Sequence, residues 1–115
     1  MGLRFMDNFK DDKYYIDKIL IDIKFIIKKM ENVDKQEFSF NELLQDSMMF
    51  RLIQLSENSI KISGKCKNEN NEIPWNAIKG LRNRIVHDYG NVDLTIVFDT
   101  LKNDIPYIFA LLRQL

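Results

Sequence analysis

The chain has 115 residues, and its 17 Lys and Arg residues balance 17 Asp and Glu residues, so its formal net charge at pH 7 is zero. This length predicts a single domain, residues 1–115, and the lack of net charge excludes a bulk electrostatic attraction to nucleic acid. A single cysteine, Cys66, excludes an intramolecular disulfide, and with the single histidine, His87, it cannot form a cysteine–histidine metal cluster.

The N-terminal part predicts a long amphipathic helix from about Asn8 to Met30. Asp7 or Asn8 is a candidate N-cap. Charged side chains interrupt the apolar run from Ile16 to Met30, so we do not expect it to span a membrane. The N-terminal segment lacks the apolar core of a signal peptide, and the cysteine usage fits the reducing cytoplasm. The apolar residues recur at spacings of three and four, as one buried face requires: Tyr15, Ile16, Ile19, Leu20, Ile23, Ile26, Ile27 and Met30.

Two shorter patterns follow. Ser39 and Glu42 form a capping box, which predicts a short helix carrying Phe40, Leu43 and Leu44. Asp46 is the candidate cap of the next helix, and Gly64 is its candidate stop. Residues 65–72 are polar or charged apart from Cys66, so we expect a surface loop there. The apolar positions of the helix after Asp46 are Met48, Met49, Leu52, Ile53, Leu55, Ile60 and Ile62.

The C-terminal half predicts two further helices. Pro74 is placed to begin the first, whose buried face would carry Trp75, Ile78, Leu81 and Ile85, and Gly90 with Asn91 would end it. Asp93 is the candidate cap of the last helix, which Pro106 should kink or split near Asn103 or Asp104. The sequence therefore predicts an all-α fold, an antiparallel bundle of four principal helices plus a short helix.

The helix after Pro74 also carries a polar stripe nearly opposite its apolar face, formed by Asn76, Gly80, Asn83 and His87. Glycine inside a helix is unfavourable by about 1 kcal/mol relative to alanine. Close approach of another backbone is one reason to accept that cost. The stripe is therefore a candidate surface for a partner.

The same helix holds the residues best suited to chemistry. His87 can transfer a proton near neutral pH, and Arg82 can hold a phosphate bidentately. Asn83 can orient a hydroxyl or the imidazole, and Tyr89 can donate a hydrogen bond or stack on a base. Together they suit cleavage of RNA without a metal or cofactor, in which the 2′-hydroxyl attacks the adjacent phosphate. A basic rim for RNA could comprise Lys61, Lys65, Lys67, Lys79 and Arg84.

Simpler interpretations stand beside this one. His87 could act only as a favourable cation near a helix C-terminus, Arg82 could be solvated or paired with Asp88, and the basic residues could form a solvated face. On an ideal helix, Arg82 and His87 point about 140° apart. They could still meet through the length of the arginine, through unwinding near Gly90, or across a two-fold axis with a second copy. We interpret Cys66 as incidental.

Around these residues the sequence resembles the HEPN superfamily, and within it the HepT-like toxins of HepT/MNT toxin–antitoxin pairs. The family motif is Arg, four to six residues, His, one residue, Tyr, and Arg82, His87 and Tyr89 match it. Asn83 supplies the polar residue common after the arginine. Further landmarks over nearly the whole chain are Ile73-Pro74-Trp75, Gly80-Leu81-Arg82-Asn83 and Asp104-Ile105-Pro106. The chain departs from the family at Ser56-Glu57-Asn58, where relatives usually have Gly-Glu-Ala.

The resemblance implies an HEPN-like homodimer whose two motifs line a shared cleft and act as a metal-independent RNase. The implied roles are general acid/base for His87, phosphate clamp for Arg82, orienting group for Asn83 and substrate contact for Tyr89. A minimal nucleotidyltransferase antitoxin is the implied partner, and in some relatives it adds AMP to the motif tyrosine, here Tyr89. Such a modification would place charge and bulk in the cleft and block RNA.

Two other classes of function fit the same residues. The neutral charge and the lack of other catalytic groups fit a non-catalytic helical module that binds RNA or a nucleotide. The stripe around Gly80 fits a purely structural, dimerising partner of the nucleotidyltransferase. Tight RNA binding without cleavage favours the first, and loss of the complex in Gly80→Leu without any effect on RNA favours the second.

Overall fold

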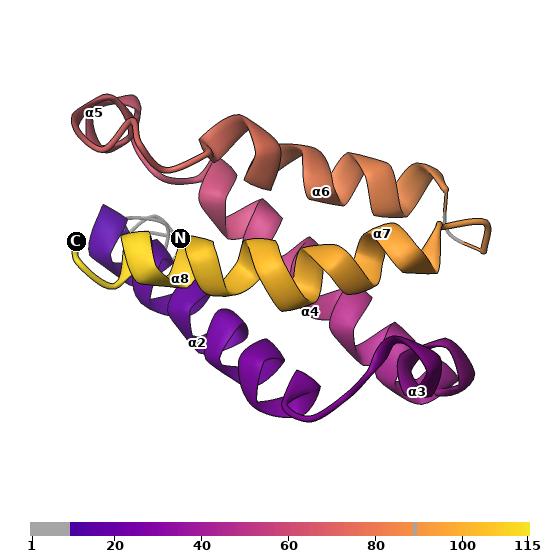
Figure 1. The fold of residues 1–115 in the computed structure, drawn as a ribbon. Coiled ribbons are helices and arrows are strands. Elements are labelled where there is room, and N and C mark those ends of the chain that lie inside the picture. The colour runs from indigo at the N-terminus through magenta and orange to yellow at the C-terminus, as the bar shows by residue number, and fades with distance from the viewer. Residues whose placement is uncertain (1–9, 89) are drawn as a thin grey trace, which may run out of the picture.

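The computed structural model describes residues 10–88 and 90–115, which form an antiparallel helical bundle without strands in these ranges (Figure 1). Figure 1 shows α6 along one side, α2 along the other, α7 and α8 in front and α4 behind them. The short helices α3 and α5 lie at opposite ends. The predicted all-helical bundle is confirmed. The elements are α2 (Asp12–Met30), α3 (Lys35–Phe40), α4 (Glu42–Ile60), α5 (Gly64–Glu69), α6 (Trp75–His87), α7 (Leu94–Asp99), the π-helical segment η1 (Thr100–Asp104) and α8 (Ile105–Leu112).

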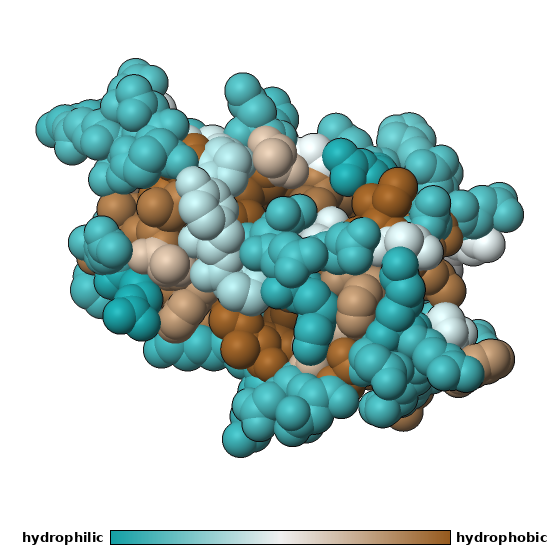
Figure 2. Space-filling model, in the orientation of Figure 1, coloured by the Kyte–Doolittle hydropathy of each residue, from teal (hydrophilic) through white to brown (hydrophobic). Residues whose placement is uncertain are grey.

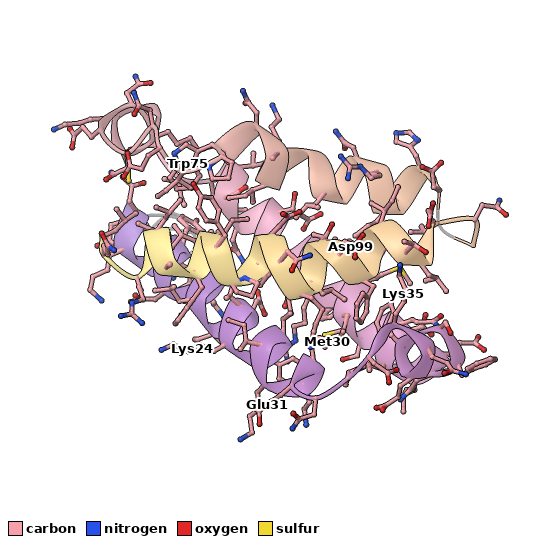
Figure 3. The ribbon with its side chains drawn as sticks, viewed as in Figure 1. Lys24, Met30, Glu31, Lys35, Trp75 and Asp99 are labelled. Atoms are coloured by element: carbon pink, nitrogen blue, oxygen red, sulfur yellow. The ribbon has the colours of Figure 1, made fainter. Side chains whose placement is uncertain are left out.

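The core forms where α4 packs against α2 and α6 and where α8 packs against α2. Figure 3 shows Met30 pointing into the bundle and Lys24 pointing away from it, as the periodicity of α2 predicts. Figure 2 shows hydrophilic side chains over one face, with apolar atoms visible between them. None of the described helices is both long and apolar enough to cross a membrane. The fully enclosed side chains include Ile19, Ile23, Ile26, Met48, Leu52, Leu55, Ile78, Leu101 and Ile105, and each such burial is worth about 1.5–3 kcal/mol.

Helix α2 follows the predicted apolar pattern but has a different start. Asp11 is its N-cap, because its carboxylate accepts a hydrogen bond from the backbone N–H of Tyr14 at 2.9 Å. The predicted caps Asp7 and Asn8 lie outside the described residues.

The short helix begins earlier than predicted, at Lys35, and ends at Phe40, so the predicted members Leu43 and Leu44 belong to α4 instead. Asp34 caps it by accepting from the N–H of Glu37 at 2.8 Å, and the hydroxyl of Ser39 donates to the carbonyl of Gln36 instead of capping. Asn41 then caps α4 by accepting from the N–H of Leu44 at 3.0 Å. The predicted caps Ser39 and Asp46 are therefore wrong, because Asp34 and Asn41 provide equally good caps earlier in the chain.

Residues 65–72 are not the predicted loop, because α5 covers most of them. Ser63 caps α5 by accepting from the N–H of Cys66 at 3.1 Å, and Gly64 begins this helix instead of ending α4. The carboxylate of Asp12 accepts from both the N–H and the hydroxyl of Ser63, at 2.8 and 2.6 Å. No apolar period indicated this helix, since a six-residue helix with no buried residue leaves none.

The last predicted helix is present and interrupted. Asp93 caps it as predicted, accepting from the N–H of Thr95 at 2.9 Å. The π-helical segment η1 lies before Pro106, so the predicted split near Asn103 and Asp104 takes the form of a widened turn. The wider π-helical turn accommodates Pro106, because proline lacks an N–H and its ring would clash with the carbonyl four residues earlier in a regular helix.

A buried ion pair joins α2 to α4 and was not anticipated. Asp22 is only 4% exposed, and its carboxylate accepts from Nη1 of Arg51 at 2.8 Å. The guanidinium lies 3.8 Å from the centroid of the Phe25 ring. Burial raises the pKa of Asp22, and the bond to Arg51 opposes that rise.

Candidate functional site

Helix α6 positions the motif. Its N-terminal end is fixed at Trp75, whose backbone N–H donates to the carbonyl of Ile73 at 2.8 Å and whose indole N–H donates to that of Asn70 at 3.0 Å. Figure 3 shows Trp75 at this end of the helix, near α5. Buried Ile78, Leu81 and Ile85 hold α6 against the bundle, as predicted. The helix ends at His87, and the following loop contains Gly90 in the left-handed region, with a φ of 94°.

Arg82 is paired across the helix interface. Its Nε donates to Oε1 of Glu57 at 2.7 Å, and both side chains are about half exposed, at 43% and 50%. The alternative partner considered from the sequence, Asp88, is instead the C-cap of α6. Glu57 lies 25 residues before Arg82, so no local pattern could have indicated this contact.

Ser56, beside Glu57 on α4, binds the backbone of the same stretch of α6. Its hydroxyl donates to the carbonyl of Lys79 at 3.0 Å and accepts from the N–H of Arg82 at 3.3 Å. The side chain is fully buried. Two adjacent residues of α4 therefore hold Arg82, one through its backbone and one through its guanidinium. Ser56 thus fills the α4–α6 contact at a position where the resemblance noted in the sequence implies a glycine.

The predicted polar stripe faces outward. Asn76, Asn83 and His87 are exposed, and a Cβ placed on Gly80 would meet nothing within 4 Å. No close approach by any described part of the chain therefore requires the glycine. Arg82 lies on the flank of α6 nearest α4, where it reaches Glu57, and no hydrogen bond joins it to His87 among the described residues.

Two further predicted site residues, Lys79 and Arg84, do not gather at one point. Lys79 and Arg84 are both exposed but point about 140° apart on an ideal helix. Arg84 lines a small cavity with Asp88 and Asp93. Tyr89 lies outside the described residues.

The thiol of Cys66 and the acidic side chains offer no further reactive or metal-binding site among the described residues. Cys66 is half-buried, and burial, with Asp12 nearby, raises the pKa of its thiol, which disfavours the reactive thiolate. Within residues 10–88 and 90–115, no three His, Cys, Asp or Glu side chains are grouped as metal ligands would be.

Exposed apolar side chains that the sequence pattern did not indicate lie on the line of α4 that reaches Glu57, the partner of Arg82. Leu43, Phe50 and Glu57 are seven residues apart on α4, so they share one outward line of the helix. Leu43 is 81% exposed and Phe50 57% exposed, and Val86 on α6 is 49% exposed.

A separate groove of about 460 Å³ lies between the α3–α4 corner and the loop after the motif. Its charged lining residues are Glu42 and Asp46. Carboxylates repel phosphate, so this groove does not suit RNA.

The family model described as "Ribonuclease HepT-like" matches residues 9–115. A candidate RNase (TTE0752) of Caldanaerobacter subterraneus subsp. tengcongensis is 21% identical over 106 residues, covering 92% of this chain and 95% of that protein. The protein named "Probable ribonuclease HepT" of Thermococcus cleftensis is 27% identical over 97 residues, covering 84% of this chain and 88% of that protein.

A candidate RNase (MJ1380) of Methanocaldococcus jannaschii is 26% identical over 99 residues, covering 86% of this chain and 91% of that protein. No solved structure shows significant similarity to the chain. The family model extends over all the helices that form and position the motif, and these relatives match along most of their own length. The chain therefore belongs to the HepT-like ribonuclease family.

Proposed function

We propose that the chain is a metal-independent endoribonuclease toxin whose active site forms between two copies of α6. The observation that carries the proposal is the spacing of Arg82 and His87 on solvent-accessible flanks of α6, in a chain of the HepT-like ribonuclease family. Their side chains supply the two functions that phosphodiester cleavage needs, charge stabilisation and proton transfer.

In the proposed reaction, the 2′-hydroxyl of RNA attacks the adjacent phosphorus while the bond to the 5′-oxygen breaks. His87 accepts the proton of the 2′-hydroxyl or donates one to the leaving 5′-oxygen. Arg82 stabilises the charge that develops on the non-bridging oxygens. Asn83 orients the hydroxyl or the imidazole, and Tyr89 contacts the substrate. The products are a 2′,3′-cyclic phosphate and a 5′-hydroxyl, and DNA is resistant because it lacks the attacking group.

A second copy of the chain completes this site in the proposal. Arg82 and His87 lie on different flanks of one α6, so a two-fold axis beside this helix would let each copy contribute one of them. Three exposed apolar side chains support such a contact, because a second copy would remove them from water: Val86, one turn after Arg82, and Leu43 and Phe50, on the outward line of α4 that reaches Glu57. The zero net charge does little to oppose self-association.

The proposed partners follow from this site. RNA, with tRNA among the candidates, is the substrate, and Lys79 and Arg84 contact different parts of it because they lie on different flanks. A minimal nucleotidyltransferase antitoxin neutralises the toxin by adding AMP to Tyr89. We place this pair in the cytoplasm, where RNA substrates are available.

The test is cleavage of tRNA and of a DNA of matched length by purified wild-type protein in EDTA, beside His87→Ala. We expect the wild type to cleave only the RNA and the variant to cleave neither. Cleavage by both proteins would refute the role of His87. If neither protein cleaves RNA, the intact mass is checked for added AMP. Tight RNA binding by unmodified protein without cleavage would then replace the proposal with a non-catalytic RNA-binding module.

A further inference from the structure

We propose that Glu57 is a positioning residue for Arg82 and sets the direction in which the guanidinium meets phosphate. This inference rests on the proposed function. It starts from the 2.7 Å bond between Nε of Arg82 and Oε1 of Glu57. Glu57 binds Nε, and the two terminal nitrogens of the guanidinium have no hydrogen bond to any described residue. Those nitrogens form one of the two guanidinium edges that can bind phosphate bidentately, and the other edge includes the Nε that Glu57 occupies.

The backbone that carries Glu57 is anchored beside Arg82, and the half-exposed Glu57 side chain extends from it to Nε. Glu57 follows Ser56, which is fully buried and bonded to the backbone of α6 at Lys79 and Arg82. The distance between α4 and α6 is therefore fixed at this point, and the carboxylate reaches Nε from a rigid support. An arginine side chain held in one direction before substrate arrives loses less conformational freedom when the transition state forms.

The charge of Glu57 has an opposite effect on substrate binding. A carboxylate beside a phosphate site repels RNA in the ground state. The proposal therefore predicts a separation of the two kinetic constants. Loss of the side chain lowers kcat, because Arg82 is no longer directed, but it leaves KM unchanged or lower, because a negative charge is gone. Loss of packing at the site would instead raise KM as well.

A competing interpretation predicts the opposite change in kcat when Glu57 is removed. If Glu57 only occupies Arg82 and blocks phosphate, its removal raises kcat. The conservative variant Glu57→Gln separates orientation from charge, because its amide oxygen still accepts a hydrogen bond from Nε but carries no charge. Under the positioning proposal this variant keeps kcat close to the wild-type value.

The experiment measures kcat and KM for RNA cleavage in EDTA with wild type, Glu57→Ala and Glu57→Gln. Glu72→Ala is the control, because it removes one exposed carboxylate that has no hydrogen bond or ion pair among the described residues. We expect kcat to fall about tenfold or more in Glu57→Ala. In Glu57→Gln it should stay within about threefold of wild type. KM should rise in neither variant, and Glu72→Ala should match wild type. A higher kcat in Glu57→Ala, or an equal fall in Glu57→Gln, would overturn the proposal.

A second readout does not depend on activity. The NMR signal of the Arg82 Nε–H should be protected from solvent exchange in wild type and Glu57→Gln, and should lose that protection in Glu57→Ala. If wild type shows this protection but no cleavage of RNA, the proposed function fails while the contact stands. If wild type cleaves RNA without protection of Arg82, the positioning proposal fails alone.

Discussion

Replacing Arg82 by alanine should abolish cleavage while leaving the fold almost unchanged. The only hydrogen-bond partner of the Arg82 side chain among the described residues is Glu57, and the two side chains are 43% and 50% exposed. An exposed pair of this kind contributes about 0.2–1 kcal/mol. Alanine has the higher helix propensity by a few tenths of a kcal/mol, which offsets part of the loss. The free energy of unfolding should therefore fall by less than about 1 kcal/mol, and Tm by less than about 8 °C.

The matched control is Leu81→Ala, one residue earlier on the same helix. Leu81 is only 8% exposed and belongs to the core cluster, so its truncation should cost about 2–5 kcal/mol. Urea denaturation followed by helical circular dichroism gives both stabilities, and RNA cleavage in EDTA gives the activity. A cost of several kcal/mol in Arg82→Ala, or cleavage at the wild-type rate, would refute the distinction between site and scaffold.

Three further predictions concern the contacts that position the site and hold the bundle. Ser56→Ala removes a hydrogen bond of 3.0 Å and one of 3.3 Å to α6, so the free energy of unfolding should fall by about 1 kcal/mol. An unchanged midpoint of urea denaturation would contradict this. The bonds from Ser63 lower the pKa of Asp12, so their stabilisation is present above pH 3.8 and is lost as the pH falls through the folded pKa. The stability difference between wild type and Ser63→Ala should therefore shrink in acid, and a difference that grows would contradict the assignment. Burial raises the pKa of Asp22, so wild type should lose stability relative to Asp22→Asn as the pH rises from 3.8 through the folded pKa. A gain of stability by wild type relative to Asp22→Asn over that pH range, measured by urea denaturation, would contradict the prediction.

Periodic features could be predicted from the sequence. The three-and-four spacing of isoleucines located α2, the apolar face of α6 followed from Trp75 to Ile85, and Asp93 was a clear cap. The short helices α3 and α5 could not be placed, because they are too short to show a period and several polar residues compete as caps.

Contacts between distant parts of the chain had no sequence signal. The Glu57–Arg82 and Asp22–Arg51 pairs join residues 25 and 29 positions apart. They depend on which helices pack together, and the sequence pattern does not specify that pairing. The periodicity of α2 also gave no sign that Asp22 would be buried, since carboxylates are seldom enclosed unless a partner such as Arg51 is present.

The chemical ends of the RNA fragments test the central claim most directly. Wild-type protein is incubated with RNA in EDTA, and the product termini are identified by mass spectrometry. Attack by the 2′-hydroxyl, with His87 and Arg82 in the proposed roles, predicts 2′,3′-cyclic phosphate and 5′-hydroxyl ends. Fragments with 5′-phosphate and 3′-hydroxyl ends would contradict the account, because they require water as the nucleophile and a different bond to break.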